Sequence, residues 1–190
     1  MDGYEVEVKA VLRRGAPGKE RDVLKESMVR RIAELGGKLR SIVEHEDIYL
    51  SHPSRDFKET DEAFRIRKER RDDRPFVLMT YKGPKLSERS KSRFEKEVAL
   101  QGGDCADDIL ELLVKLGFSK VLEVKKSRTF LDLGDVKLSI DEVEGLGLFL
   151  EAEVRSEDIR GSEDELFELM GRLEVREFER RSYLELLLEK

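Results

Sequence analysis

The sequence predicts an α+β domain built around an antiparallel β-sheet or barrel. Eight segments alternate apolar and polar residues with the period of two that half-buried strands show. Four other segments place apolar residues at helical spacing, and turn-forming or charged residues separate most of the elements. A chain of 190 residues lies within the usual size of one domain, about 100–200 residues, so we expect a single domain spanning residues 1–190.

The first predicted strand shows the alternation most clearly. Val6 and Val8 share one face, whereas Glu5 and Glu7 share the other. Later segments repeat this pattern, because charged residues alternate with Phe, Ile, Leu or Val. The predicted strands cover residues 4–12, 39–50, 63–69, 76–82, 93–100, 121–131, 136–143 and 148–154.

Four helices are predicted from apolar stripes and from their end signals. The first ends at Gly36-Gly37 and the second at Gly117, since glycine is typical just after a helix. The last two are predicted to begin at the capping boxes Ser162-x-x-Glu165 and Ser182-x-x-Glu185. The stripes are Leu24, Met28, Ile32 and Leu35; Ile109, Leu112, Leu113 and Leu116; Leu166, Met170 and Leu173; and Leu184, Leu187 and Leu188.

The composition narrows the class of protein. Charged residues make up 42% of the chain, against about 25% in an average protein, yet the net charge is −6. An acidic balance disfavours a general nucleic-acid binder, and no apolar run approaches the roughly 20 residues of a membrane helix. We therefore expect a cytoplasmic protein without nucleic-acid or membrane partners. The absence of Asn and the single Gln101 indicate a protein adapted to high temperature.

The face opposite the apolar residues of each strand carries charge. This face could simply meet solvent, as in many antiparallel sheets, or it could line the inside of a barrel whose apolar outside is covered by helices. In a barrel, the cations and the carboxylates would converge. The cations are Lys9, Arg65, Arg67, Lys82, Arg93, Lys126 and Arg128, and the carboxylates are Glu5, Glu7, Glu95, Glu97, Asp141, Glu151 and Glu153.

Converging groups of both signs favour one kind of ligand. Arginine and lysine side chains bind the oxygens of a polyphosphate, and carboxylate oxygens bind a hard divalent cation such as Mg²⁺ or Mn²⁺. A site that holds both sets is suited to a metal–polyphosphate complex.

At this point the chain resembles a known family. Glu5-Val-Glu-Val-Lys9 fits the E-x-E-x-K signature of the CYTH superfamily, the triphosphate tunnel metalloenzymes. The C-terminal segment Arg181 to Leu187 is similar to the ending of the class IV adenylyl cyclase branch, and the resemblance spans nearly the whole chain. Matching segments between these two are His45 to Leu50, Phe64 to Arg67, Tyr81 to Pro84, Lys126 to Arg128, Ser139 to Asp141, Gly145 to Gly147 and Glu151 to Glu153.

The resemblance implies an eight-stranded antiparallel tunnel with roles for particular residues. Metal-binding positions would be Glu5, Glu7, Glu151 and Glu153, with Mg²⁺ or Mn²⁺ as cofactor. Triphosphate-binding positions would be Lys9, Arg65, Arg67, Lys82, Lys126 and Arg128. Catalytic roles would fall to Glu5, Glu7, Lys9 and Asp141. The register of Arg93 and Glu95 stays open, because the segment 85–92 before them has no periodicity.

For function, the resemblance implies a class IV adenylyl cyclase that converts ATP to cyclic AMP and pyrophosphate. Alternatives are hydrolysis of inorganic triphosphate, thiamine triphosphate or a nucleoside triphosphate, and a non-catalytic module that binds polyphosphate or nucleotide. Glu153 bears on this choice, since a second carboxylate at that position suits the triphosphatases. A homodimer is also expected from the resemblance.

Other conspicuous residues are expected to be structural. His45 and His52 lack a partner at catalytic spacing, and Cys105, the single cysteine, excludes an internal disulfide and lies in an acidic context that disfavours a thiolate. The charged run Arg70 to Arg74 is expected to form a solvated hairpin tip, and Gly145-x-Gly147 lacks the rest of a dinucleotide-binding fingerprint.

Overall fold

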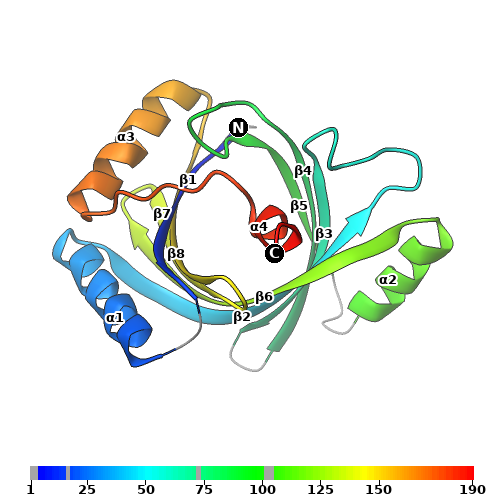
Figure 1. Ribbon diagram of the computed structural model, residues 1–190, viewed down its shortest axis with the longest axis horizontal. Helices are drawn as coiled ribbons and strands as arrows, with labels where there is room; N and C mark the ends of the chain where they lie inside the picture. Colours follow the sequence, from blue (N-terminus) through cyan, green and yellow to red (C-terminus); the bar gives the residue numbers. More distant parts are fainter. Residues whose placement is uncertain (1–3, 16–17, 72–73, 101–104) are drawn as a thin grey trace.

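The protein is an eight-stranded antiparallel barrel, and the described part of the chain places three helices outside it and one inside (Figure 1). The computed structural model describes residues 4–15, 18–71, 74–100 and 105–190. Around the closed ring the strand order is β1-β5-β4-β3-β2-β6-β7-β8, and this confirms the predicted fold class. The strands are β1 (Tyr4–Arg14), β2 (Lys38–Ser51), β3 (Ala63–Arg71), β4 (Arg74–Lys85), β5 (Arg93–Leu100), β6 (Ser119–Leu133), β7 (Val136–Val143) and β8 (Gly147–Ser156).

The predicted alternation sets which side chains face inward. On β1, Val6 and Val8 point outward into an apolar cluster, whereas Glu5 and Glu7 point into the barrel. The charged rows therefore line an interior and do not face bulk solvent, which decides between the two interpretations of the sequence. Six of the seven predicted cations and six of the seven predicted carboxylates line one cavity; Lys9 and Asp141 lie behind its wall.

Two helices cover the outside of the barrel around β1 and β8. Helix α1 (Lys19–Glu34) contributes Met28 and Ile32, and α3 (Ile159–Arg172) contributes Leu166 and Met170, to a cluster with the outer faces of β1, β7 and β8. Burial of these apolar stripes is the main stabilising contribution of the two helices. Gly36, with a φ of 95°, ends the α1 region as predicted.

A third helix, α2 (Ala106–Lys115), packs on the other side, where Ala106 meets Ile66 of β3 and Val77 of β4. The outer face of β5 differs from the prediction that helices would cover the apolar outside. Phe94 and Val98 on that face are 49% and 42% exposed, because the α2 cluster reaches β5 only at Leu100 and the other outer helices pack on β1, β7 and β8.

The last helix, α4 (Tyr183–Leu188), lies inside the ring of strands (Figure 1). Tyr183 and Leu186 pack there against inward-facing Phe149 and Val124, so the helix fills one part of the barrel interior. The predicted stripe of α4 is thus partly wrong, since Leu188 is 51% exposed. Helices normally pack outside a sheet, and the sequence pattern contains nothing that reverses this expectation.

The two predicted capping boxes have different outcomes. Ser182 and Glu185 form a complete capping box at the start of α4, which confirms that prediction. The box at Ser162 is wrong, because α3 begins one turn earlier, where the Asp158 carboxylate accepts a hydrogen bond from the backbone N–H of Gly161. Among the described residues, no helix has both the length and the apolar character required to cross a membrane.

Candidate active site

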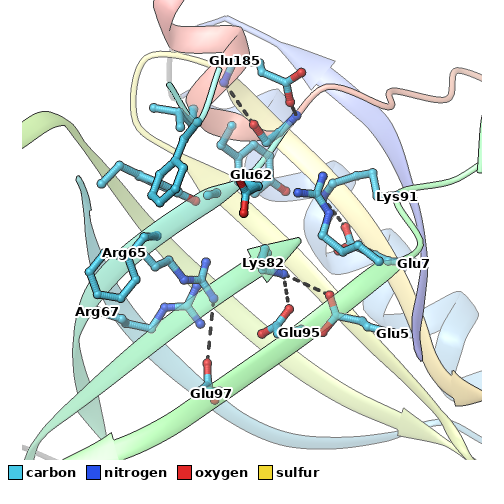
Figure 2. A pocket seen from close by; sticks show the side chains of 18 of the residues that line it. Glu5, Glu7, Glu62, Arg65, Arg67, Lys82, Lys91, Glu95, Glu97 and Glu185 are labelled. Atoms are coloured by element: carbon cyan, nitrogen blue, oxygen red, sulfur yellow. Dashed lines mark hydrogen bonds and ion pairs between the residues drawn. The ribbon is translucent and has the colours of Figure 1, made fainter. Parts of the chain in front are cut away.

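A cavity of about 770 Å³ occupies the barrel interior (Figure 2). Side chains from all eight strands, the segment 56–62, Lys91 and α4 line it. Two walls can be distinguished, because β3, β2 and β6 are neighbours on one side of the ring and β5, β1 and β8 are neighbours on the opposite side. The first, the cationic wall, carries Arg65, Arg67, Lys126 and Arg128. The second, the carboxylate wall, carries Glu5, Glu7, Glu95, Glu151 and Glu153, together with Arg93 and Arg155.

On the cationic wall, Asp47 orients the two arginines of β3. Arg67 donates from Nε and Nη2 to the two Asp47 oxygens at 2.6 and 2.9 Å, and Arg65 donates from Nη1 at 3.1 Å. Burial by itself would raise the pKa of Asp47, but Arg67 and then Arg65 lower it well below its ordinary value. The buried Nε of Arg65 has no hydrogen-bond partner among the described residues, so this arginine keeps a free donor beside the cavity.

Asp141 of β7 plays the same part for the cations of β6. It accepts from Lys126 Nζ at 2.8 Å and from Arg128 Nε at 2.6 Å, because Arg128 and Asp141 are directly paired across the two strands. Burial and then the neighbouring Arg128 lower the pKa of Lys126 to about 8. Asp141 itself is fully buried. Its contacts orient these cations, while the catalytic role that the resemblance implies stays a prediction.

The carboxylate wall begins with Glu5, whose charge is poorly compensated. Burial raises the pKa of Glu5 to about 8; Lys82 opposes this rise, and Glu153 and Glu95 add to it. Lys82 bridges Glu5, at 3.0 Å, and Glu95. Glu153, whose pKa is also raised by burial and then by Glu7, lies on the neighbouring strand β8. Several carboxylates therefore share one buried region with few cations.

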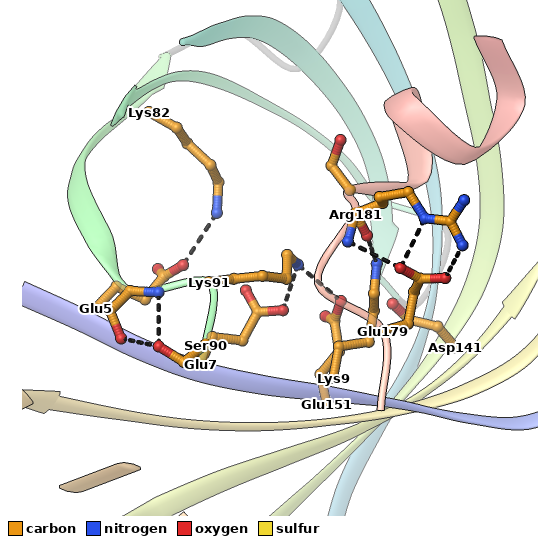
Figure 3. A network of polar contacts seen from close by, with 12 residues as sticks. Glu5, Glu7, Lys9, Lys82, Ser90, Lys91, Asp141, Glu151, Glu179 and Arg181 are labelled. Atoms are coloured by element: carbon orange, nitrogen blue, oxygen red, sulfur yellow. Dashed lines mark hydrogen bonds and ion pairs between the residues drawn. The ribbon is translucent and has the colours of Figure 1, made fainter. Parts of the chain in front are cut away.

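Lys91 joins the other two carboxylates (Figure 3). Its Nζ lies 2.5 Å from Glu7 of β1 and 3.4 Å from Glu151 of β8. Burial by itself would raise the pKa of Glu151, but Lys91 and then Arg128 lower it well below its ordinary value. Lys91 was not among the predicted site residues, because it lies on the aperiodic segment between β4 and β5.

The donor chemistry of this wall fits a hard divalent cation. Glu5, Glu7, Glu151 and Glu153 supply carboxylate oxygens only, which are the ligands that Mg²⁺ and Mn²⁺ prefer. Within the described ranges, no three acidic, histidine or cysteine side chains already converge as metal ligands. Ammonium groups lie between the carboxylates instead, with Lys91 between Glu7 and Glu151.

Lys9 lies behind the cavity wall and not on it. It is 2% exposed, donates to the carbonyl oxygen of Arg181 and has its ammonium 4.2 Å from the centre of the Tyr183 ring. Burial and then Lys91 lower the pKa of Lys9 to about 7. The C-terminal segment thus covers this lysine, and direct contact between Lys9 and a triphosphate stays a prediction.

One end of the cavity is less polar. Leu50, Phe57, Phe64 and Leu184 line it together with acidic side chains of the 56–62 segment and α4. Lys85 links these two segments, because its Nζ lies 2.6 Å from Asp61 and 3.3 Å from Glu185. The loop and the helix therefore close this end together.

The remaining candidates have structural surroundings, in agreement with the predictions. His45 is buried with Nε2 2.8 Å from Glu69, and burial lowers its pKa to about 3. His52 packs against the rings of Phe57 and Phe118. Cys105 packs at the edge of the α2 cluster. No helix follows Gly147, which begins strand β8, so the dinucleotide fingerprint is absent there. The tip of the Arg70 to Arg74 run lies outside the described residues.

Residues that periodicity did not assign complete the site. Asp47 follows the alternation of β2, but an aspartate between His45 and Tyr49 gave no signal that it would hold two arginines. Arg93 and Glu95, left open by the sequence, both line the cavity.

Comparison with known proteins agrees with this fold and site. The CYTH domain model matches residues 3–183. A Methanocaldococcus jannaschii protein named "Putative adenylate cyclase MJ0240" is 41% identical over 167 residues, which cover 85% of this chain and 91% of that protein. The structure of the PH1819 protein from Pyrococcus horikoshii has a TM-score of 0.84 and 41% identity, with 97% of this chain and 98% of that chain covered.

A more distant structure shows the fold alone. It is a Hippeastrum protein described as a putative adenylyl cyclase with a dominant triphosphatase activity, at 15% identity and a TM-score of 0.66. It covers 98% of this chain and 95% of its own. The family match spans nearly the whole chain and both walls of the cavity, and this protein therefore belongs to the CYTH domain family.

Proposed function

We propose that this protein is a divalent-metal-dependent enzyme of the class IV adenylyl cyclase type, which converts ATP to cyclic AMP and pyrophosphate. The observation that carries the proposal is that one cavity has a cluster of arginines and lysines on one side and most of its carboxylates on the other. A triphosphate needs the first wall, and its divalent cation needs the second. The CYTH family acts on triphosphate substrates such as ATP and generally uses divalent metal ions.

The cationic wall is suited to the phosphate chain. Arg65 and Arg67 present planar guanidinium groups whose remaining N–H donors can bind phosphate oxygens. Arg128 keeps Nη1 for this purpose, because its Nε and Nη2 donate to Asp141 and Glu151. Buried aspartates fix these groups in advance, so little side-chain entropy is lost when the ligand binds. Lys82 lies on β4, between the two walls, and can reach either the phosphate chain or the carboxylates.

The chemistry then depends on position and charge. A bound Mg²⁺ or Mn²⁺ would neutralise phosphate charge and lower the pKa of the attacking hydroxyl. Glu5, Glu7, Glu151 and Glu153 would hold the ion. The ribose 3′-hydroxyl gives its proton to solvent water and its oxygen attacks the α-phosphorus. The bond from that phosphorus to the β-phosphate oxygen breaks, and pyrophosphate leaves. Arg65 and Arg128 would stabilise the charge that builds up on the phosphate oxygens.

The apolar end of the cavity supports a substrate with an organic group. Phe57 of the 56–62 segment and Leu184 of α4 offer apolar surface in the same cavity as the cations, and a base can stack or pack there. Inorganic triphosphate would leave this surface unused. Together with the 41% identical relative named as an adenylate cyclase, this favours ATP.

Hydrolysis of a triphosphate is the second candidate, and Glu153 favours it. This carboxylate lines the cavity beside Glu7 and has a raised pKa, so it could accept a proton from a water molecule that attacks the terminal phosphorus. Inorganic triphosphate, thiamine triphosphate and nucleoside triphosphates are the substrates to compare.

Product analysis decides between these reactions. The purified protein is incubated at several temperatures with ATP, and separately with inorganic triphosphate, in the presence of Mg²⁺ or Mn²⁺. Cyclic AMP with an equal amount of pyrophosphate is the expected result. Orthophosphate without cyclic product would overturn the cyclase proposal and show that the protein is a triphosphatase.

Two variants separate an enzyme from a binding module. Arg65→Ala should weaken triphosphate binding in either case. Glu151→Gln should abolish turnover while some binding remains, because the proposed metal ligand is lost and most of the cationic wall is kept. Turnover that survives both Glu5→Ala and Glu151→Ala would overturn the metal assignment. Binding without any product from the wild type would leave a polyphosphate-binding module.

A further inference from the structure

Lys91 lies on the segment 86–92, which joins β4 to β5 and passes beside β1. Its backbone N–H donates to the carbonyl oxygen of Glu7 at 2.9 Å. This bond extends the contact between β1 and β5, which otherwise has the single aligned pair Glu5 and Arg93. The backbone of Lys91 is thereby fixed at the line where these two strands meet.

The side chain of Lys91 continues from this anchor into the carboxylate wall. Its ammonium lies between Glu7, at 2.5 Å, and Glu151, at 3.4 Å, and its side chain is 11% exposed (Figure 3). These two glutamates come from adjacent strands and are both proposed metal ligands. Glu151 also pairs with Arg128, whereas Lys91 is the cation that contacts both glutamates and so reduces their mutual repulsion in a buried site.

We propose that Lys91 is a built-in counter-ion that competes with the divalent cation for Glu7 and Glu151 and so sets the metal affinity of the site. This inference rests on the proposed function, since it takes those glutamates as metal ligands. An ammonium within 4 Å of both carboxylates and a divalent ion bound to the same oxygens repel each other strongly. The ammonium therefore leaves when the metal binds, and it becomes free to contact the phosphate oxygens of the substrate.

The local structure permits this exchange. Lys91 is anchored through its backbone, so its flexible side chain can turn without opening the barrel. The outer part of the loop is held separately, because Arg89 donates to Asp164 at 2.7 Å and Arg180 donates to the Ser87 carbonyl at 2.9 Å. Lys82, the other bridging lysine, is in contrast a strand residue that pairs with Glu95 across β4 and β5.

Metal titration by calorimetry tests the proposal without any substrate. The metal-free protein, prepared with a chelator, is titrated with Mn²⁺ as wild type, Lys91→Met and Lys96→Met. Lys96 is an exposed residue of β5, so its variant loses the same charge outside the cavity. The dissociation constant should fall roughly tenfold in Lys91→Met and stay within about twofold in Lys96→Met, because only the first loses a competing cation.

The melting temperature of Lys91→Met provides a second test, because removal of the lysine should lower it without metal and enlarge its increase when metal binds. Without metal, Lys91→Met should melt at a lower temperature than wild type, because Glu7 loses its ion pair and Glu151 keeps only the one with Arg128. Saturating Mn²⁺ should then raise its melting temperature by more than it raises that of the wild type. Equal Mn²⁺ affinity in all three proteins, or weaker binding in Lys91→Met, would overturn the counter-ion role.

Acetylation of the wild type keeps the test independent of how the variant folds. Lysine labelling is followed by mass spectrometry with and without Mg²⁺, and the modification rate of Lys91 should rise with metal while that of Lys96 stays constant. An unchanged or lower rate at Lys91 contradicts the exchange. A wild type that binds no Mn²⁺ would instead contradict the proposed function, so the two failures are distinguishable.

Discussion

The carboxylate of Asp141 accepts a hydrogen bond from Arg128 Nε at 2.6 Å and forms an ion pair with Lys126 Nζ at 2.8 Å. One fully buried aspartate thus fixes two cations on the wall of the cavity. Asp47 does the same for Arg65 and Arg67. The cations are therefore oriented before any phosphate binds, and this arrangement depends on two acidic residues behind the wall.

The first prediction concerns the orientation of Lys126 and Arg128 by Asp141. Asp141→Asn keeps the shape of the side chain but removes the charge that Lys126 and Arg128 face. We expect a loss of stability of about 3 kcal/mol, measured by urea unfolding, because breaking a buried ion pair leaves uncompensated charge. We also expect a higher KM for the triphosphate substrate, because the two cations lose their common orientation.

Asp132→Asn is the matched control. Asp132 lies on β6 outside the site and pairs with Arg40, and the Arg40 side chain is 61% exposed. Its loss should change stability by less than about 1 kcal/mol and leave KM unaltered. If Asp141→Asn behaved like this control, the orienting role of Asp141 would be wrong.

The second prediction uses the raised pKa of Glu5. In the metal-free folded protein this pKa is about 8, against 4.5 ordinarily, so between these values the folded state binds a proton that the unfolded state has lost. The contribution of Glu5 to stability should therefore fall as pH rises from about 4.5 to about 8. Unfolding curves of wild type and Glu5→Gln across this range measure it. A stability difference between the two proteins that does not change with pH would contradict the assignment.

The third prediction concerns Lys9, whose contribution to stability should rise with pH. The pKa of Lys9 in the folded protein is about 7, against 10.5 ordinarily, so between these values the unfolded state binds the extra proton. Stability relative to Lys9→Met should therefore rise as pH increases from about 7 to about 10.5. Unfolding free energies at pH 7, 8.5 and 10 give this slope, and a flat or falling difference would show that Lys9 keeps its proton.

Much of this fold was predictable because the barrel imposes a simple rule on its strands. Outward residues such as Val8 meet helices and inward residues such as Glu7 meet the cavity, so a period of two appears in the sequence. The ends of the strands were less predictable. Strand β6 runs from Ser119 to Leu133, beyond the predicted 121–131, because its backbone pairing with β2 extends past the alternating residues.

The site was predictable only where its residues lie on strands with this alternation. Arg65 and Glu151 were found in this way, and both line the cavity. Lys91 was missed because a loop has no period, and its position depends on a single backbone bond to Glu7. The cover over Lys9 was missed because it comes from Arg181 and Tyr183, whose path into the barrel is set by tertiary packing alone.

The fourth prediction concerns the helix inside the barrel. The Ser182 hydroxyl accepts from the Glu185 backbone N–H at 3.1 Å, and the Glu185 carboxylate accepts from the Ser182 N–H at 2.6 Å. Ser182→Ala should cost about 1 kcal/mol of stability in urea unfolding. Ser162→Ala is the control, because Ser162 lies within α3 and caps nothing. Equal losses in both variants would mean that the cap does not stabilise α4.

The pairing of β1 with β8 affects how the protein folds. Glu7 is aligned with Glu153, and Lys9 with Glu151, although about three quarters of the chain lies between each pair. During synthesis, β1 cannot pair with β8 until Gly147–Ser156 has been made. Such distant pairings fold slowly and leave an unpaired strand edge exposed in the meantime. The carboxylate wall is thus complete only once β8 has been made, and a chain that stops before β8 lacks Glu151 and Glu153, two of the four proposed metal ligands.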